Sequence, residues 1–303
     1  MYDVIIIGSG PAGLSAAVYA SRAGLNLLVL EKNFMSGGQI LNTYEVDNYL
    51  GMPGVNGFDM GMQFRAHADK FGVPFQTASV LSIEDLGDKK LVHTAKEVYE
   101  TKTVIVATGA QHAQLGVVGE EEFMGRGVSY CATCDGAFFG GKTVAVVGGG
   151  DVALEDAIYL ARVCEKVYLI HRRDELRGAM ILQESLKKLS NVEILYNHVV
   201  EEICGTEGVE SIRIQNGKTG EKMELALSGV FIAVGTLPDT KLLKELVALN
   251  EDGYVIAGED CVTDRPGILA AGDIRRKPLR QVVTAVADGA NAAVSAEYYC
   301  RRL

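Results

Sequence analysis

The chain has 303 residues, of which 48% are hydrophobic and 22% are charged. These fractions are ordinary for a folded globular protein, and at roughly 150 residues per domain the length allows two domains. The formal net charge of −10 argues against nucleic acid or an anionic membrane as a partner, because both would repel the chain. The chain has neither a basic, apolar leader nor a run near the ~18 apolar residues of a membrane span, so we expect a cytoplasmic protein.

The first segment is typical of a unit that binds a dinucleotide. An apolar strand over 3–8 leads directly into Gly-Ser-Gly-Pro-Ala-Gly at 8–13, a helical pattern of small residues follows, and a second apolar strand ends at Glu31. In such a turn the first glycine allows the tight bend, and the second lets the backbone approach a pyrophosphate. The third lets the helix pack closely on the strand, and the phosphates lie at the helix N-terminus.

The same order of patterns returns later in the chain. A strand over 143–147 is followed by Gly-Gly-Gly-Asp-Val-Ala at 148–153, a helical pattern, and a strand over 167–170. A single glycine motif is weak evidence because glycine-rich turns are common, but two copies with a strand before and a helix after are much more specific. We therefore predict an α/β fold with two Rossmann-like, nucleotide-binding domains.

The residues at the ends of the two second strands distinguish the ligands. Glu31 and the His-Arg-Arg at 171–173 stand equally far past the first glycines of their motifs. A carboxylate at this place accepts hydrogen bonds from ribose hydroxyls and repels a 2′-phosphate, whereas arginines bind a 2′-phosphate through charge-assisted bonds. The first unit should therefore bind FAD or NAD, and the second, with Arg177 as a further cation, should bind NADPH. The alternative for the arginines is an ordinary solvated basic cluster.

Distant segments are expected to complete the first site. Strand patterns over 103–109, 230–235 and 267–271 each run into a glycine turn, and the last turn is followed by Asp273. An acidic residue at the carboxyl end of a strand in an α/β sheet faces the ligand crevice, where it suits the ribityl chain of a flavin. The alternative for Asp273 is a plain turn residue. A helix pattern over 281–299 follows.

This order along the chain predicts one domain inserted in another. The segments that complete the first site come after the second glycine motif, so residues 1–113 and 242–303 should form the FAD-binding domain. Residues 114–241 should form the inserted domain, which carries the second motif. Two short joints between compact domains would permit a hinge.

The predicted chemistry centres on Cys131 and Cys134, which are separated by two residues and followed by Asp135. Two cysteines at this spacing form a small, reducible disulfide, and the carboxyl group beside them can exchange a proton with a thiolate. One alternative is half of a zinc site, but a structural zinc ion needs four ligands and the sequence has no second Cys-x-x-Cys, so no metal is expected. The others are a buried, inert pair of cysteines, and a plain turn role for Asp135.

Flavin, a dithiol and NADPH together form a coherent electron relay. At this point the chain resembles the low-molecular-weight thioredoxin reductases of bacteria and archaea, which are FAD-containing pyridine nucleotide-disulfide oxidoreductases. The resemblance runs almost end to end. It is most specific in Cys-Ala-Thr-Cys-Asp-Gly at 131–136 and in the basic cluster at 171–177. It extends to residues 8–13, 37–39, 46–51, 107–110, 125–128, 148–153, 271–273 and 280–281.

The resemblance implies that electrons pass from NADPH through FAD to a Cys131–Cys134 disulfide and then to oxidised thioredoxin. Cys134 would lie against the flavin, Cys131 would attack thioredoxin, and Asp135 would carry the proton. The family is homodimeric, and its inserted domain rotates between the half-reactions. FAD would be bound by Gly8, Gly10, Pro11, Ala12, Glu31, Gly38, Gln39, Asn48, Thr108, Gly109, Gly272, Asp273, Arg280 and Gln281. NADPH would be bound by Gly148, Gly150, Asp151, Arg172, Arg173 and Arg177.

Two departures and one surface are specific to this chain. Val152 replaces the small Ser or Thr that the family has after its glycines, and its bulk would loosen NADPH. Ala113 stands where the family often has Arg. Arg126, Phe138 and Phe139 match the region that meets thioredoxin, although ordinary surface charge and core aromatics would explain them equally well.

Other functions remain open from the sequence. Family relatives that take electrons from ferredoxin or reduced flavin lack the arginine cluster, so its presence argues against them. A dithiol oxidase, or a reductase for a glutaredoxin-like or peroxiredoxin partner, would carry the same two cysteines. A flavin-binding redox sensor is a third possibility, but a sensor has no use for a proton-carrying Asp135.

Overall fold

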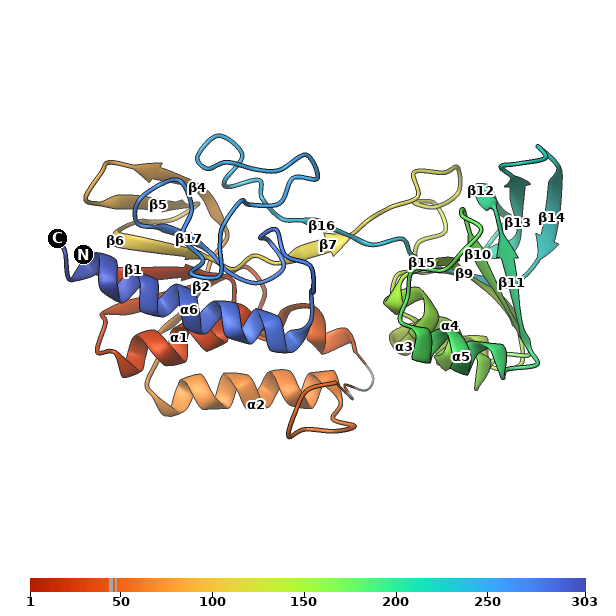
Figure 1. The fold of residues 1–303 in the computed structure, drawn as a ribbon, viewed down its shortest axis with the longest axis horizontal. Helices are drawn as coiled ribbons and strands as arrows, with labels where there is room; N and C mark the ends of the chain where they lie inside the picture. The colour runs from red at the N-terminus through yellow and green to blue at the C-terminus, as the bar shows by residue number, and fades with distance from the viewer. Residues whose placement is uncertain (44–45, 47) are drawn as a thin grey trace. The chain divides into compact units, whose positions relative to one another are not determined.

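The computed structural model describes residues 1–43, 46 and 48–303, without the side chains of Asn42, Cys134 and Thr236. The chain forms two compact units (Figure 1). Unit 1 combines Met1–Gln111 with Leu237–Leu303, and unit 2 is the continuous segment His112–Thr236. The prediction of an α/β fold with two Rossmann-like domains is confirmed, because each unit has a core of parallel strands in which a strand, a glycine turn and a helix follow one another.

A single large sheet organises unit 1. Four strands pair in the order β3-β2-β1-β6, β17 also pairs with β6, and all of these pairings are parallel. The two remaining strands, β5 and β4, extend the sheet in the antiparallel sense beyond β6. The strands are β1 (Tyr2–Ile7), β2 (Leu27–Glu31), β3 (Phe75–Thr77), β4 (Val80–Asp85), β5 (Lys90–Thr94), β6 (Val98–Val106) and β17 (Ile268–Ala270).

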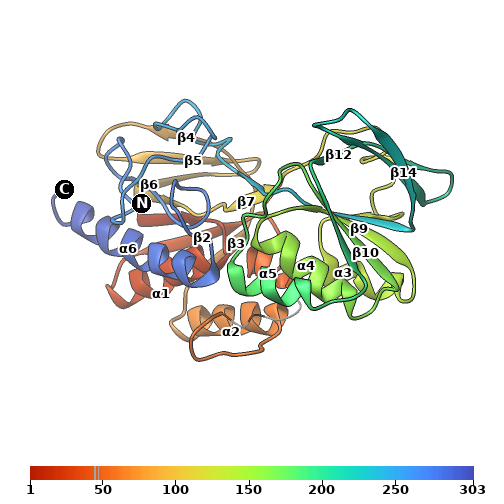
Figure 2. The ribbon, with the colours of Figure 1, turned by 45° about the vertical axis from the view of Figure 1, so that its right-hand side comes forward.

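Helices from opposite ends of the chain cover one face of this sheet. Helices α1 (Pro11–Arg22) and α6 (Val282–Cys300) lie side by side in both ribbon views (Figures 1 and 2). Their closeness depends on glycine, because a Cβ at Gly289 would lie 2.0 Å from the carbonyl oxygen of Ala12. The face also carries α2 (Gly57–Lys70) and the short η1 (Gly38–Asn42). The small residues in both helix patterns thus serve to bring the C-terminal helix next to the first glycine turn.

Unit 2 is a sheet between two layers. Its central strands pair in the order β11-β10-β9-β15-β8, all parallel. Helices pack on one face, and an antiparallel sheet of β12, β13 and β14 packs on the other. The strands are β8 (Val128–Ser129), β9 (Thr143–Gly148), β10 (Lys166–His171), β11 (Val192–Tyr196), β12 (His198–Gly205), β13 (Val209–Asn216), β14 (Lys222–Ala226) and β15 (Gly229–Ala233). The helices are α3 (Ala132–Asp135), η2 (Gly136–Phe139), α4 (Asp151–Ala161) and α5 (Met180–Lys187).

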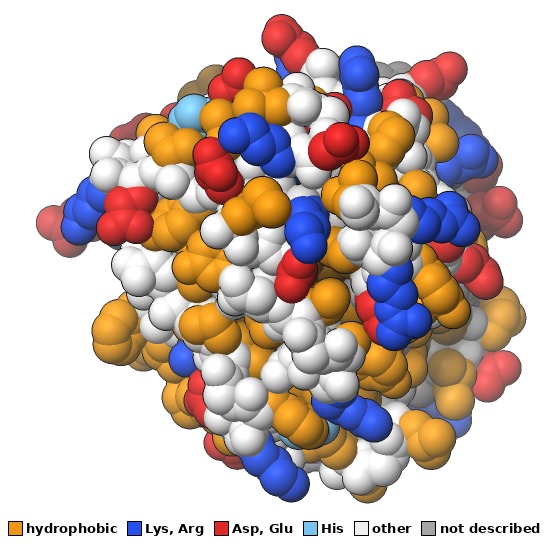
Figure 3. Space-filling view, turned by 90° about the vertical axis from the view of Figure 1, so that its left-hand side faces the viewer, with side chains coloured by type: hydrophobic (Ala, Val, Ile, Leu, Met, Phe, Trp, Pro, Cys, Tyr) orange, Lys and Arg blue, Asp and Glu red, His pale blue; other side chains and the backbone are white. Residues whose placement is uncertain are grey.

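The chain passes between the units at two short strands that pair with each other, β7 (Ala110–His112) and β16 (Thr236–Pro238). None of the described helices is long and apolar enough to cross a membrane. Figure 3 shows the face of unit 1 on the side of the chain termini, where acidic, basic and hydrophobic side chains are interspersed. The described side chains on this face form no region of a single charge sign.

Candidate functional site

The first glycine turn has the geometry of a phosphate cradle. Gly8 has a φ of +101°, and a Cβ there would lie 2.5 Å from the carbonyl oxygen of Ala107. A Cβ at Gly13 would lie 1.9 Å from the carbonyl oxygen of Gly8, so the helix touches the strand end. At Gly10, by contrast, the nearest atom to an added Cβ is the Cα of Gly38 at 3.9 Å, an ordinary contact, and Pro11 begins α1 directly after it. The turn therefore leads straight into the N-terminus of α1, where the backbone N–H groups suit a bound pyrophosphate.

Glu31 lies against this turn. Parallel pairing of β1 with β2 places the two strand ends side by side, and one carboxylate oxygen of Glu31 accepts hydrogen bonds from the backbone N–H and the hydroxyl of Ser9, at 2.7 and 2.8 Å. The other oxygen accepts from the N–H of Asn33 at 2.8 Å. The carboxylate is thus fixed beside the turn where a ribose would lie, as its place in the sequence predicts.

Several predicted FAD residues from distant segments also meet here. The N–H of Gly37 donates to the Ser9 carbonyl at 2.8 Å, which holds the Gly37–Gln39 turn against the first motif. A Cβ at Gly38 would lie 3.2 Å from the Cα of Gly10. The Asn48 amide donates to the side-chain oxygen of Gln281 at 3.0 Å, although the two residues are far apart in the sequence.

The strand ends of β6 and β17 contribute the remaining predicted positions. The Thr108 hydroxyl donates to the carbonyl of Asp239 at 2.7 Å, and the carbonyl of Gly109 accepts from the N–H of the same residue at 3.0 Å. Gly272 has a φ of +82°, and a Cβ there would lie 2.9 Å from the Cβ of Ala12. Residue 47, next to Asn48 and within the expected match over 46–51, lies outside the described residues.

Asp273 is incompletely satisfied in a way that points to a ligand. Its Oδ1 is buried and has no hydrogen-bond partner among the described residues, and the ammonium of Lys277 is 3.6 Å away, beyond hydrogen-bond distance. Burial raises the pKa of Asp273 while the charges of Lys277 and Arg280 lower it. The Nε of Arg280 is likewise buried without a partner, although its guanidinium stacks 3.9 Å from the ring centre of Tyr254. Unsatisfied buried polar groups are rare and costly, so a donor or acceptor from a ligand fits this corner.

The second glycine turn, in unit 2, holds the arginine loop close. A Cβ at Gly149 would lie 2.2 Å from the ring of His171, and the carbonyl of Gly149 accepts from the N–H of Arg177 at 2.7 Å. Gly150 is the N-cap of α4, and Asp151 accepts from the N–H of Ala179 at 2.7 Å, which ties down the far end of the loop. Burial lowers the pKa of His171, so this ring is neutral near neutral pH.

The predicted 2′-phosphate cations are exposed and available. Arg172, Arg173 and Arg177 are all exposed, and none of them makes a salt bridge with any residue that the structure describes. The neighbouring acidic residue, Asp174, pairs instead with Lys218 at 2.8 Å. The loop therefore presents three free cations beside a glycine turn, which suits an anionic group on a nucleotide.

The cysteine pair lies at the start of α3, directly after β8. Cys131 is in a disulfide, and the other four cysteines outside the Cys-x-x-Cys are free. The side chain of Cys134 lies outside the described ones, so its pairing with Cys131 stays a prediction. The Asp135 carboxylate accepts a hydrogen bond from the Ser129 hydroxyl at 2.6 Å. Sequence reasoning missed Ser129, and its only signal was its place two residues before the first cysteine.

Comparison with known proteins settles the family. The family model described as pyridine nucleotide-disulphide oxidoreductase matches residues 2–289. The chain belongs to this family. It is 45% identical to a thioredoxin reductase of Bacillus subtilis, over 100% of this chain and 96% of that protein. It is 44% identical to a thioredoxin reductase of Listeria innocua, over 100% of this chain and 95% of that protein.

Solved structures of family members match over the same span. The crystal structure of Lactococcus lactis thioredoxin reductase in its FR conformation has a TM-score of 0.96, at 42% identity, with all of both chains covered. The thioredoxin reductase of T. acidophilum has a TM-score of 0.91 at 36% identity, over 98% of each chain. A ferredoxin-flavin thioredoxin reductase from Clostridium acetobutylicum also matches, with a TM-score of 0.55 at 33% identity, over 100% of this chain and 99% of that one.

In this pyridine nucleotide-disulphide oxidoreductase, the aromatic pair after the cysteines has two different roles. Phe138 is 75% exposed, whereas Phe139 is buried and packs edge-on against Phe231 with ring centres 5.3 Å apart. Of the two interpretations left open for these residues, the core aromatic holds for Phe139, while Phe138 is exposed as a partner-facing residue would be. Val152 has a side chain 55% exposed at the start of α4, so its bulk is accommodated at the surface.

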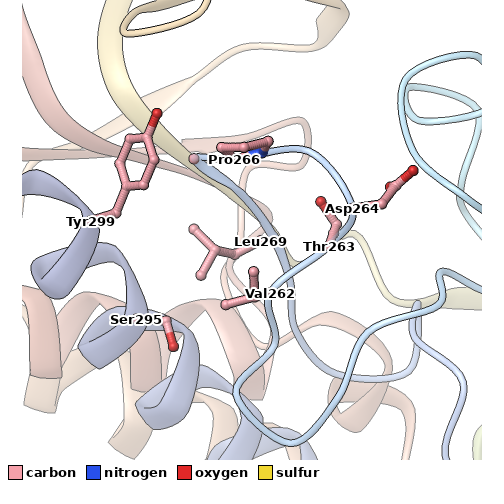
Figure 4. Close-up of a pocket in the computed structure, with 8 residues that line it drawn as sticks. Val262, Thr263, Asp264, Pro266, Leu269, Ser295 and Tyr299 are labelled. Carbon is pink, nitrogen blue, oxygen red and sulfur yellow. The ribbon is translucent and has the colours of Figure 1, made fainter.

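A small pocket in unit 1 of this oxidoreductase lies away from these residues. It is lined by side chains that include Val262, Leu269, Ser295 and Tyr299 (Figure 4). These positions are near the amino end of β17 and the last turns of α6, whereas the FAD candidates gather at the carboxyl ends of the strands. The pocket is therefore not part of the predicted site. Among the described residues, no three His, Cys, Asp or Glu side chains are grouped as metal ligands would be.

Proposed function

We propose that the protein is an NADPH-dependent thioredoxin-disulfide reductase. One observation carries the proposal: the unit that holds the Cys131 disulfide also presents three arginines without salt-bridge partners beside a nucleotide-binding glycine turn. A thiol-disulfide centre and a site for a phosphorylated nicotinamide nucleotide in one unit together favour one reaction, the reduction of a disulfide by NADPH. The thioredoxin reductases of Bacillus subtilis and Listeria innocua, which match over the full chain, support thioredoxin as the disulfide substrate.

Unit 1 would bind FAD. The N-terminus of α1 after Gly10 would take the pyrophosphate, and Glu31 would accept from the adenosine ribose. The Oδ1 of Asp273 would accept a hydrogen bond from a ribityl hydroxyl, and the Nε of Arg280 would donate one to the flavin, since neither atom has a hydrogen-bond partner among the described residues. Bound FAD would supply two-electron transfer between a nicotinamide and a disulfide. We propose residues 1–113 and 242–303 as the FAD-binding domain.

Unit 2 would bind NADPH, with the NADPH-binding domain proposed at 114–241. Gly148 and Gly150 would let the pyrophosphate approach the N-terminus of α4, and Asp151 would hold the loop that carries the arginines. Arg172, Arg173 and Arg177 would pair with the 2′-phosphate, which distinguishes NADPH from NADH.

The cysteines would then exchange electrons with the substrate. Two electrons would open a Cys131–Cys134 disulfide, and Cys131 would attack the disulfide of thioredoxin to form a mixed disulfide. Cys134 would attack that mixed disulfide, which restores the pair and releases reduced thioredoxin. Asp135 would take a proton from the attacking thiol and return it to the leaving thiolate. The balance is NADPH plus a proton plus a thioredoxin disulfide, giving NADP⁺ and a thioredoxin dithiol.

We also propose that unit 2 rotates between half-reactions, with β7 and β16 as the two joints, and that the protein is a cytoplasmic homodimer. Two short connecting segments that pair only with each other provide a compact hinge. The rotation and the homodimer are what the resemblance to the low-molecular-weight thioredoxin reductases implies, and relatives that match over the full chain carry that name.

A second electron donor deserves a direct test because a ferredoxin-flavin thioredoxin reductase is among the matching structures. The experiment is anaerobic: FAD-loaded protein is mixed with NADPH, oxidised bacterial thioredoxin is added, and flavin and NADPH absorbance are followed. Flavin bleaching with NADPH, followed by steady NADPH consumption only after thioredoxin is added, supports the proposal. If NADPH bleaches the flavin but added thioredoxin causes no NADPH consumption, the electron acceptor is another disulfide or oxygen. No bleaching by NADPH overturns the assigned donor.

A further inference from the structure

Ser129 occupies a point that links the cysteine pair to its neighbouring carboxylate. It is the last residue of β8, lies opposite Phe231 of β15, and is only 5% exposed. Its hydroxyl therefore points into the interior of unit 2, where water does not compete for its hydrogen bonds. The roles proposed above for the two cysteines and Asp135 make no use of it.

Three hydrogen-bond contacts converge on the Ser129 hydroxyl. It accepts from the backbone N–H of Cys131 at 3.0 Å. It lies 2.6 Å from the Oδ2 of Asp135 and 3.2 Å from the carbonyl oxygen of Cys131, both of which are acceptors. A serine hydroxyl carries a single proton, so it can donate to only one of these two acceptors at a time. The shorter distance is typical of a hydroxyl donating to an ionised carboxylate.

The arrangement satisfies both protonation states of the carboxyl group. While Asp135 is ionised, Ser129 donates its proton to Oδ2. Once Asp135 takes up a proton, that oxygen becomes a donor and the serine oxygen becomes its acceptor. The serine proton then turns to the carbonyl of Cys131, which is already within reach at 3.2 Å. No backbone atom needs to move, and no polar group in the set is left without a partner.

We propose that Ser129 is a positioning residue that holds Asp135 through its proton transfer by rotating its own hydroxyl between two acceptors. The inference rests on the proposed function, in which Asp135 takes a proton from the thiol that becomes the attacking thiolate and returns it to the leaving thiolate. The serine proton itself stays on Ser129 throughout, so the transfer of a proton between Asp135 and the thiols needs no further reactant. The hydrogen bond from the N–H of Cys131 fixes the serine oxygen, which in turn holds the Asp135 carboxyl group beside the Cys131 backbone.

Other ionisable groups near α3 must be separated from this effect. Helix α3 packs on η2 and α4, and β8 packs on β15. Neither η2 nor β15 carries an ionisable group, while α4 carries Asp151, Glu155, Asp156 and Tyr159. The preceding segment carries Tyr130, whose hydroxyl donates to Glu120 at 2.6 Å. Burial raises the pKa of Asp156 to about 7, so this residue titrates in the range that the experiment covers.

The test measures the thiols directly in the full-length, FAD-loaded protein. Wild-type protein and its variants are reduced with dithiothreitol, desalted without oxygen, and alkylated with iodoacetamide from about pH 5 to about pH 9. In Ser129→Ala the Asp135 carboxylate loses the donor that holds it beside the thiols, so the profile of alkylation rate against pH moves to higher pH by about one unit. Ser129→Thr keeps a hydroxyl and restores the wild-type profile.

Two controls isolate the serine. Ser211→Ala removes a hydroxyl that donates to Glu224 at the same 2.6 Å on the distant β13, and it leaves the profile unchanged. In an Asp156→Asn background the Ser129→Ala shift persists. An Asp135→Asn background abolishes the shift, because the carboxylate that Ser129 holds is no longer present.

The opposite results overturn the inference. A Ser129→Ala profile that matches the wild type, or a shift that survives Asp135→Asn, means that the hydroxyl only packs the strand end. If Ser129→Ala does not fold, the profile of Ser129→Val, which has the shape of threonine but no hydroxyl, decides in the same way. Alkylation needs no partner, so the result stands apart from thioredoxin-dependent turnover, whose absence in the wild type would defeat the proposed function alone.

Discussion

The guanidinium of Arg275 and the carboxylate of Asp288 form a buried, two-point ion pair, with Nε to Oδ2 at 2.7 Å and Nη2 to Oδ1 at 2.5 Å. Asp288 stands on α6 and also accepts from the N–H of Gly272 at 2.9 Å and from Lys277 at 3.0 Å. One carboxylate therefore ties the C-terminal helix to the turn that presents Asp273. The FAD candidates at this corner depend on a residue that no nucleotide-binding motif contains.

We expect Asp288→Asn to destabilise the protein severely. The substitution leaves two buried cations without their counter-ion, and breaking a buried pair in this way costs about 3–5 kcal/mol. Thermal unfolding of the FAD-free protein would report the loss as a lowered Tm. Glu297→Gln is the matched control: it removes the exposed Arg301 pair from the same helix and should cost less than about 1 kcal/mol. Equal losses in the two variants would contradict the role of burial.

Asp273→Asn should weaken FAD binding with little change in fold. Its Oδ1 accepts no hydrogen bond from the residues that the structure describes, so it is available to a ligand, and a charged hydrogen bond is worth about 1.5–3 kcal/mol. This corresponds to a loss of about tenfold or more in affinity, measured by titrating apoprotein with FAD and following flavin fluorescence. The exposed Asp252→Asn provides the control. Unchanged FAD affinity in Asp273→Asn would show that the residue is only a turn former.

The double variant Arg172→Ala with Arg173→Ala should erode the preference for NADPH over NADH. Each arginine lacks a salt-bridge partner among the described residues, so its charge is available to the 2′-phosphate. We expect kcat/KM with NADPH to fall by about tenfold or more while the value with NADH changes little. Lys218→Ala, which removes a nearby cation already paired with Asp174, should leave the ratio unchanged. A constant ratio in the double variant would defeat the assignment.

Asp156 should make the protein less stable as the pH rises. Burial raises its pKa in the folded state from 3.8 to about 7, with the charge of Glu155 adding to the effect. Between those two pH values the folded chain binds more protons than the unfolded chain, so stability is full below the unfolded pKa and falls as the pH rises towards 7.

Asp156→Asn removes this titration. The variant should be more stable than the wild type above neutral pH, by about 2 kcal/mol, and the difference should shrink in acid. Unfolding in urea at several pH values measures both. Glu193→Gln, in an exposed pair with Lys166 on the neighbouring strands, controls for the general loss of a carboxylate in unit 2. A difference that does not vary with pH would mean that the Asp156 carboxyl group is not the cause.

Much of the site could be anticipated because its signals are local. The strand expected at 143–147 is observed as β9 over Thr143–Gly148, and the helix expected at 281–299 is observed as α6 over Val282–Cys300. Glycine at Gly8 and Gly148 is required by positive φ angles within single turns, and residues at strand ends meet because parallel strands share a carboxyl edge. Such features depend on a few neighbouring residues, so the amino-acid pattern is sufficient to predict them.

The two glycine turns, the cysteine pair and the residue types at each strand end could be read from the amino-acid pattern, because backbone sterics and periodicity act over short stretches. The pattern could not show that Phe139 joins the core while Phe138 is exposed, or that Ser129 bridges Cys131 and Asp135. Nor could it show that Asp288 anchors Gly272. These relationships depend on which side of each element is packed against the rest of the unit, and a buried charge or hydroxyl finds its partner only once that packing has excluded water.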